Sequence, residues 1–169
     1  MGASLFVSVQ ERAAVRACRD IVRLRTERRL QFVDLTALVA ERVRRSGVRE
    51  GMVSVQSRHT TAAVLVNENE PLLLQDFEDL LGRWAPADAR YRHNDLGARE
   101  GAPADERPNG HAHARALLLG TSVCLNVAEG GLDLGEWQSV FLVELDGPRD
   151  RSVSVQVLGV PRGQGDHRS

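Results

Sequence analysis

The sequence predicts a mainly β fold of the α+β class: a sandwich of antiparallel or mixed sheets with two to three helices packed on it. Apolar and polar residues alternate with a period of two in several short segments, which is typical of half-buried strands. Helical periodicity, in contrast, is confined to a few segments. A chain of 169 residues fits one domain with its own core.

Strand patterns recur along the chain. Every second residue is apolar in residues 5–9, 22–25, 53–56 and 152–157. A fifth segment, Trp137 to Leu145, is longer and more apolar. We expect this segment to form a central strand, with Trp137 in the core.

Several polar residues near these strands have simple structural interpretations. Glu144 and Asp146 lie two apart, so they share a strand face, which we expect to be solvated. Cys124 lies in an apolar run, where a buried thiol is expected. Cys18 is far from Cys124 in the sequence, so nothing indicates a disulfide framework or a thiolate metal site.

Helices are expected in three places. Asp34 is a suitable cap for a helix over residues 35–46, whose apolar residues share one face. Asn69 is the expected cap of a second helix, which has Pro71 in its first turn. A third, shorter helix is expected over residues 111–119, which are rich in helix formers.

We expect one domain over residues 1–160 and a flexible, polar tail over residues 161–169. The chain shows neither a signal peptide nor an apolar stretch of membrane-spanning length. A cytoplasmic protein without membrane association is therefore expected. The net charge of -1 disfavours a nucleic acid as partner.

All 22 basic residues are arginine. A lysine of a phosphate-binding loop, a Schiff-base lysine and a lysine general base are therefore excluded. Recognition of a phosphate or carboxylate must use arginine, backbone N–H groups or a metal.

Four of the five histidines lie between His59 and His113, and they indicate a metal site or a proton-transfer site. His93 and Asp95 lie in a long polar segment, residues 85–110, and loops of this length are usually functional or disordered. His111 and His113 are two residues apart. On a helix they would point about 200° apart, so only one would reach the site, whereas on an extended chain both would.

We assign provisional roles to the polar residues around these histidines. His59, Thr60 and Asp95 are candidate catalytic residues, and Asp95 is an alternative metal ligand or a partner that orients an imidazole. Thr61 and Arg149 are candidates for binding a cofactor or a phosphate. The candidate metal ligands are His93, His113 and His111.

Seven short motifs together resemble the YjbQ-like family, which is often labelled "secondary thiamine-phosphate synthase". The resemblance extends from about Leu5 to about Gly159. Glu136 departs from it, because the family usually has Thr before Trp-Gln. The motifs, in order, are His59-Thr60-Thr61-Ala62, Asn67-Glu68-Asn69, Tyr91-Arg92-His93-Asn94-Asp95, Asn109-Gly110-His111-Ala112-His113, Leu119-Gly120-Thr121-Ser122, Gly135-Glu136-Trp137-Gln138 and Glu144-x-Asp146-Gly147-Pro148-Arg149.

The resemblance implies a compact β-sandwich, a homotrimer and a histidine-rich pocket near a subunit interface. In the family the second histidine of His-x-His is the more regular one, which favours His113 over His111. The label implies a transferase that joins two phosphorylated precursors of thiamine phosphate. Such chemistry needs a divalent metal, and imidazole ligands suit zinc, nickel, cobalt or iron better than magnesium.

Three functional hypotheses follow from these residues. The first is a metal-dependent enzyme, with zinc as the favoured metal, that acts on a phosphorylated small molecule. The second is a non-catalytic trimer that binds a metal or a phosphorylated metabolite. The third is metal-free acid–base chemistry with His59 or His93 as the base, and no serine-hydrolase motif supports it.

Overall fold

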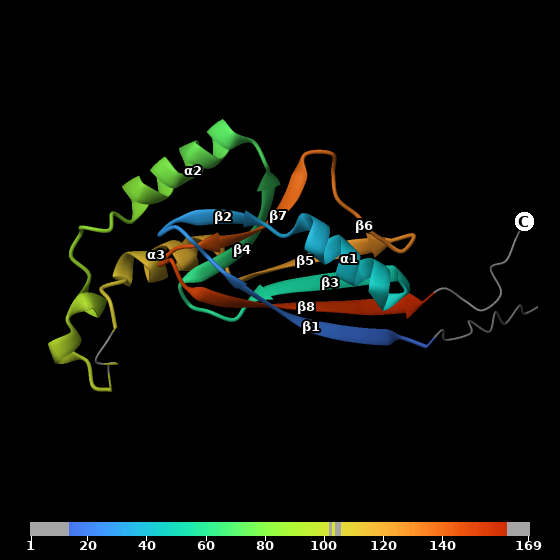
Figure 1. Ribbon diagram of the computed structural model, residues 1–169, viewed down its shortest axis with the longest axis horizontal. Coiled ribbons are helices and arrows are strands. Elements are labelled where there is room, and N and C mark those ends of the chain that lie inside the picture. The colour runs from blue at the N-terminus through green and yellow to red at the C-terminus, as the bar shows by residue number, and fades with distance from the viewer. Residues whose placement is uncertain (1–13, 102, 104–105, 162–169) are drawn as a thin grey trace, which may run out of the picture.

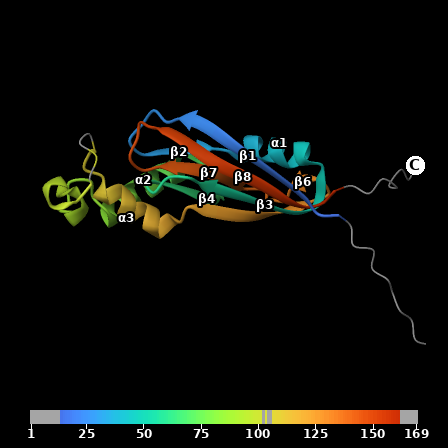
Figure 2. The ribbon, with the colours of Figure 1, turned by 90° about the horizontal axis from the view of Figure 1, so that it is seen from below.

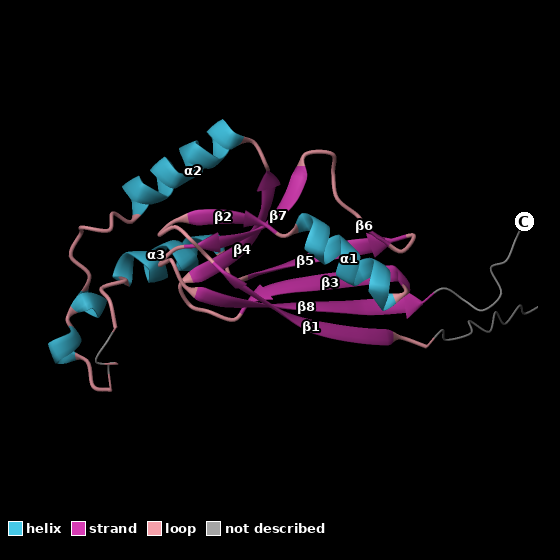
Figure 3. Cartoon of the chain, viewed as in Figure 1, coloured by secondary structure: helices cyan, strands magenta, loops and turns pink. Residues whose placement is uncertain are grey.

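Two antiparallel sheets and three helices make up the computed structural model, which describes residues 14–101, 103 and 106–161. One sheet has five strands in the order β1-β8-β3-β5-β6, and the other has three in the order β2-β7-β4. The strands are β1 (Arg16–Arg25), β2 (Gln31–Asp34), β3 (Val48–Ser57), β4 (Ala62–Glu68), β5 (Ser122–Ala128), β6 (Gly131–Leu132), β7 (Gln138–Glu144) and β8 (Asp150–Pro161). The helices are α1 (Thr36–Ser46), α2 (Pro71–Trp84) and α3 (Gly110–Leu119), with two 3-10 turns, η1 (Arg92–Asn94) and η2 (Leu96–Ala98). Figure 3 shows the strands at the centre and the helices around them, which confirms the predicted mainly β, α+β fold.

The main core lies between the five-stranded sheet and a layer formed by α1 and the three-stranded sheet. Alternate residues of β8, Val153, Val155 and Val157, are at most 2% exposed and face this core. Val39 and Val43 of α1 are fully buried against them. The period-two and helical patterns of the sequence therefore identify the inward faces of these elements.

A second apolar cluster covers the other face of the three-stranded sheet. It joins Phe141, Val143 and Leu145 from the β7 segment to residues of α2 and α3. β7 is consequently buried on both faces, which confirms the central strand expected from its apolar sequence.

The elements that bear on function gather at one end of the molecule. Figures 1 and 2 show α3 and the two 3-10 turns at this end, and β1 begins and β8 finishes at the opposite end. The β7–β8 turn and the β3–β4 loop also lie at the α3 end, because β8 begins where β3 finishes in the antiparallel pairing of these two strands.

The structure corrects both predicted helix caps: the N-cap position of α1 is occupied by Leu35 and not by Asp34, which ends β2 and still bonds the first turn. Asp34 Oδ1 accepts the N–H of Thr36 at 2.7 Å, at the start of α1. In α2, the cap is Glu70 and not Asn69: its carboxylate accepts the N–H groups of Leu72 and Leu73. The Asn69 amide instead donates to Asp34 Oδ2 at 3.0 Å and ties the two helix starts together.

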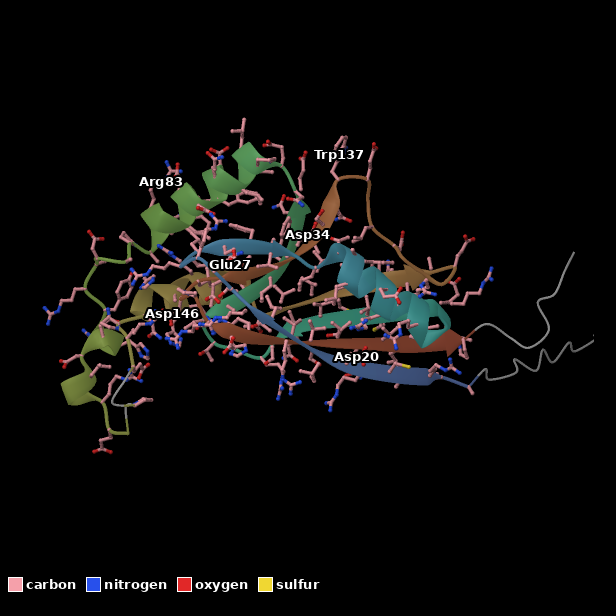
Figure 4. The ribbon with its side chains drawn as sticks, viewed as in Figure 1. Asp20, Glu27, Asp34, Arg83, Trp137 and Asp146 are labelled. Atoms are coloured by element: carbon pink, nitrogen blue, oxygen red, sulfur yellow. The ribbon has the colours of Figure 1, made fainter. Side chains whose placement is uncertain are left out.

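The predicted burial is wrong for four residues. Cys124 is exposed, because it lies on the outer face of the five-stranded sheet beside Met52. Trp137 is 67% exposed and projects where the chain enters β7 (Figure 4). Glu144 and Asp146 are at most 4% exposed rather than solvated, because other side chains and backbone amides satisfy their carboxylates.

The predicted strand at residues 5–9 and the predicted tail, apart from Pro161 at the end of β8, lie outside the described residues. Within the described part of the chain, no helix combines the length and the apolar character needed to cross a membrane.

Candidate functional site

A cavity of about 630 Å³ opens at the α3 end of the molecule. Four separate segments build its wall: the β3–β4 loop, the long segment before α3, the first turn of α3, and the β7–β8 turn with the start of β8. Figure 4 labels Asp146 in this region, where β7 ends beside α3. The lining residues are Arg58, His59, Thr60, Thr61, His93, Arg99, Pro103, Glu106, Asn109, His113, Asp146, Arg149 and Arg151.

His59 is held by the first residues of β8. Its Nε2 accepts the backbone N–H of Ser152 at 2.8 Å and lies 3.1 Å from the Ser152 hydroxyl. Burial lowers the pKa of His59 below its usual value, and the positive charge of Arg151 lowers it further. His59 is therefore neutral near pH 7 and carries its proton on Nδ1.

A buried ion pair lies behind Thr61. The Arg151 guanidinium donates to both Glu144 oxygens, through Nε at 2.6 Å and through Nη2 at 2.5 Å. Nη2 also donates to the Thr61 hydroxyl at 3.0 Å. Burial alone would raise the pKa of Glu144, but the hydrogen bonds from Arg151 and from the Asp146 amide outweigh it and leave the pKa lowered.

Asp146 connects the β7–β8 turn to the start of α3. Its Oδ2 accepts from Arg149 Nη2 at 2.7 Å and from Asn109 Nδ2 at 3.2 Å. Arg107 donates to its backbone carbonyl at 2.8 Å. Arg149 thus lies in the pocket wall as expected, but its guanidinium is oriented by Asp146.

His93 and His113 meet in the pocket wall, with ring centroids 4.5 Å apart. His93 Nε2 lies 3.6 Å from Glu106 Oε1, which is beyond hydrogen-bonding distance, and it is buried without a hydrogen-bond partner. Burial lowers the pKa of His113, and the neighbouring His93 lowers it further. Two imidazoles and one carboxylate therefore lie together, with one ring nitrogen unsatisfied.

Two candidates lie away from the pocket. His111 is 2% exposed in the protein interior, near Tyr91, and both of its ring nitrogens are buried without a partner. Its place follows from the helical geometry of α3, which turns it away from His113. Asp95 is exposed between η1 and η2 and does not line the cavity.

The other candidates, His59, Thr60, Thr61, His93, His113 and Arg149, all line the cavity. In the described part of the chain, however, no three histidine, cysteine, aspartate or glutamate side chains are arranged to surround a metal ion. The His93–His113 pair is thus at most part of a metal site, and further ligands would have to come from water, a substrate or another subunit.

Seven of the lining residues were not among the candidates from the sequence: Arg58, Arg99, Pro103, Glu106, Asn109, Asp146 and Arg151. One signal was present: Arg151 continues the alternation of Val153, Val155 and Val157, and therefore faces inward. An arginine on a core face needs a buried carboxylate, and Glu144 at the end of the most apolar strand supplies it.

The pocket wall favours anions. Four arginines line it, and three of them are paired with carboxylates: Arg99 with Glu106, Arg149 with Asp146, and Arg151 with Glu144 behind the wall. Arg58 takes part in no ion pair among the described residues, so its charge is available to a ligand. A cationic cavity of this size suits a small anionic metabolite.

Comparisons with known proteins agree with the resemblance in the sequence. A family model described as "UPF0047 protein YjbQ-like" matches residues 20–160. A "UPF0047 protein" of Methanothermobacter thermautotrophicus is 44% identical over 138 residues, which cover 82% of this chain and 90% of the relative. One from Archaeoglobus fulgidus is 38% identical and covers 80% of this chain and 97% of its own.

Solved structures show the same fold. A Sulfolobus solfataricus protein, described as YbjQ-like and of unknown function, superposes with a TM-score of 0.79 at 33% identity, covering 86% of this chain and 99% of that one. A hypothetical protein from Aeropyrum pernix superposes with a TM-score of 0.74 at 37% identity, covering 83% and 98%.

Proposed function

We propose that this chain, which belongs to the YjbQ-like UPF0047 family, is an enzyme that acts on a phosphorylated small molecule bound in the α3-end pocket. The positive charge of Arg58, which has no ion-pair partner among the described residues, carries this proposal. A phosphate group needs several cationic or N–H donors, and in a chain without lysine the arginines must supply them.

The arginines have different roles in this proposal. Arg58 is free of ion pairs among the described residues and makes the first contact with the phosphate. Arg149, held at 2.7 Å by Asp146, offers its remaining donors in a fixed direction. Thr60, exposed on the β3–β4 loop, adds a hydroxyl. Together they orient the substrate against His93 and His113.

A divalent metal, with zinc favoured by the imidazole ligands, is part of the proposal. The unsatisfied, buried Nε2 of His93 fits a metal-ligand role, and His113 lies next to it. A metal bound there would supply Lewis-acid stabilisation of phosphate oxygens. Glu106, 3.6 Å from His93, would orient that ring or accept a proton from the substrate.

Thiamine-phosphate synthesis, which the family label implies, is one reaction of this class. Its two substrates both carry phosphate groups, in accord with the cationic wall, and it is the first reaction to test. The described lining contains no phenylalanine, tyrosine or tryptophan for a pyrimidine to stack on, so other phosphorylated substrates belong in the same screen.

We also propose the homotrimer that the resemblance implies. The outer face of the five-stranded sheet exposes Met52 and Leu158, which are direct neighbours in the β3–β8 pairing, and Val160. Burial of this face between subunits would remove apolar area from water. Light scattering should give the mass of a trimer for the parent, and Leu158→Asp should shift it towards the monomer. A monomeric parent would remove the trimer from the proposal.

Calorimetric titration with inorganic phosphate and pyrophosphate tests the anion site. Arg58→Gln should weaken binding by about tenfold, the effect of one charged hydrogen-bond donor. Arg25→Gln is the matched control, because Arg25 pairs with Asp150 on the surface and lies outside the pocket. Equal affinities of the two variants, or no binding by the parent, would contradict the proposal.

Turnover is then measured with metal-loaded protein on the thiamine-phosphate precursors and on a panel of phosphorylated metabolites. Turnover that requires His113 supports the enzyme. Tight binding without turnover across the panel would instead indicate a binding protein.

A further inference from the structure

The hydrogen bonds of His59 fix which of its nitrogens carries a proton. A backbone N–H can only donate, so Nε2, which receives the Ser152 N–H at 2.8 Å, must offer its lone pair. The proton of the neutral ring therefore lies on Nδ1. Nδ1 has no hydrogen-bond partner among the described residues and is not fully buried. The His59 side chain lines the cavity. His59, a lining residue, thus keeps one N–H donor that no described residue accepts.

Thr61 is restricted in a similar way. Its hydroxyl oxygen accepts from Arg151 Nη2 at 3.0 Å, and its backbone carbonyl accepts from the same nitrogen at 3.2 Å. No acceptor for the hydroxyl proton occurs among the described residues, although the residue is only 6% exposed. The Thr61 O–H is therefore available as a donor to a molecule in the pocket.

Arg151 completes the set. Its Nε and Nη2 donate hydrogen bonds to Glu144, and Nη2 also donates to Thr61. Its Nη1 makes none of these hydrogen bonds and is not fully buried. The side chain is only 3% exposed, and Glu144, which has no exposed surface and accepts from three further donors (the Thr26 hydroxyl and the N–H groups of Leu145 and Asp146), holds it rigidly. Nη1 is thus a fixed cationic donor in the pocket wall.

These three neighbours share one property: each keeps a donor that no described residue accepts, whereas Arg151 has no acceptor and His59 Nε2 and the Thr61 hydroxyl already accept a hydrogen bond inside the protein. A group that offers only acceptors is the complement of such a surface. We propose that His59, Thr61 and Arg151 form an oxyanion subsite that binds a phosphoryl group of the substrate. This inference rests on the proposed function, and it assigns His59 as a neutral hydrogen-bond donor rather than a general base.

The protonation of His59 is tested directly on the full-length parent protein. Nitrogen-15 NMR of histidine-labelled protein near pH 7 should show His59 protonated on Nδ1 and unprotonated on Nε2, with the assignment made by the loss of its signals in His59→Asn. Inorganic phosphate should shift the Nδ1–H signal. A ring protonated on Nε2, or on both nitrogens, would overturn the assignment without any variant having to fold.

Matched variants test the contribution of each donor, with inorganic phosphate as the probe in calorimetry. His59→Asn keeps an amide N–H near the position of Nδ1 and should bind phosphate within about threefold of the parent, whereas His59→Gln should bind about tenfold more weakly. Thr61→Ser should likewise retain affinity, and Thr61→Val should lose about tenfold.

The outcomes separate this subsite from the broader function. Phosphate binding by the parent that is insensitive to both His59→Gln and Thr61→Val would overturn the subsite and leave the proposed function in place. An absence of phosphate binding in the parent would overturn both.

Discussion

The carboxylate of Glu144 and the guanidinium of Arg151 form a two-point ion pair that is almost completely removed from water. Their side chains are 0% and 3% exposed, and the two bonds measure 2.6 Å and 2.5 Å. The pair joins the end of β7 in one sheet to the start of β8 in the other, directly behind Thr61 and the pocket. It therefore links the packing of the sandwich to the geometry of the site.

Replacing Glu144 with Gln should destabilise the protein by about 3–5 kcal/mol, because a buried arginine would lose its charged partner. Denaturant unfolding of parent and variant measures this free energy. Asp150→Asn is the control: it removes an ion pair between two exposed side chains, and its effect should be too small to resolve. A similar loss for both variants would mean that the buried pair has no special importance.

Glu144 also predicts the response of stability to acid. Its pKa is lower in the folded than in the unfolded protein, so the folded state binds fewer protons. Its stabilising contribution is fully present above the usual value of about 4.5 and is lost as the pH falls towards the folded pKa. Unfolding free energies measured between pH 5 and pH 3 should therefore fall in the parent and fall less in Glu144→Gln.

Local sequence patterns predicted much of this arrangement. Alternation identified β1, β3 and β8, and the helical argument about His-x-His placed only one imidazole in the pocket. Local patterns do not show which strands are neighbours in a sheet. Glu144 pairs with Gln31 on one side and Ala62 on the other, and Arg151 pairs with Leu24. The residues adjacent to Glu144 and Arg151 in the sequence do not indicate these cross-strand neighbours. Glu144 was therefore predicted to be solvated.

Asp95 illustrates the opposite error. Its position two residues after His93 suggested that both belong to one site. The segment instead forms two consecutive 3-10 turns, which leave His93 in the pocket wall and Asp95 exposed. In a long loop, sequence spacing does not define a common face, because the backbone has no fixed period there.

The metal proposal makes different predictions for the two histidines of α3. His113→Ala and His93→Ala should both lose bound zinc, because their rings meet at 4.5 Å in the pocket wall. His111→Leu should retain zinc, because its ring lies in the interior. Elemental mass spectrometry on untagged protein measures the stoichiometry. Loss of metal from a folded His111→Leu protein would contradict this division, and a metal-free parent after reloading would exclude the metal itself.

His111 should make the protein sensitive to mild acid. Burial, followed by the charge of Arg115, lowers its pKa below the usual value of about 6.5, so the unfolded chain binds a proton that the folded chain does not. Its effect appears as the pH falls below about 6.5 and lowers stability by at most about 1.4 kcal/mol per pH unit.

Unfolding free energies at pH 7.5, 6.5 and 5.5 measure the sensitivity to mild acid. His111→Leu should reduce the decline without removing it, because burial also lowers the pKa values of His59 and His113. An identical pH profile for parent and variant would show that His111 does not contribute.

Two helical glycines should respond oppositely to the same substitution. A Cβ on Gly110, the first residue of α3, would lie 2.5 Å from Tyr91 Cβ, whereas a Cβ on Gly82 in α2 would meet nothing within 4 Å. Gly82→Ala should stabilise the protein by about 0.5–1 kcal/mol, because alanine loses less backbone entropy in a helix. Gly110→Ala should cost about 1–3 kcal/mol and displace the Tyr91 segment, which carries His93. Phosphate affinity should then fall in Gly110→Ala and stay unchanged in Gly82→Ala. Unchanged stability and affinity in Gly110→Ala would show that the close approach of α3 to this segment does not position the pocket wall.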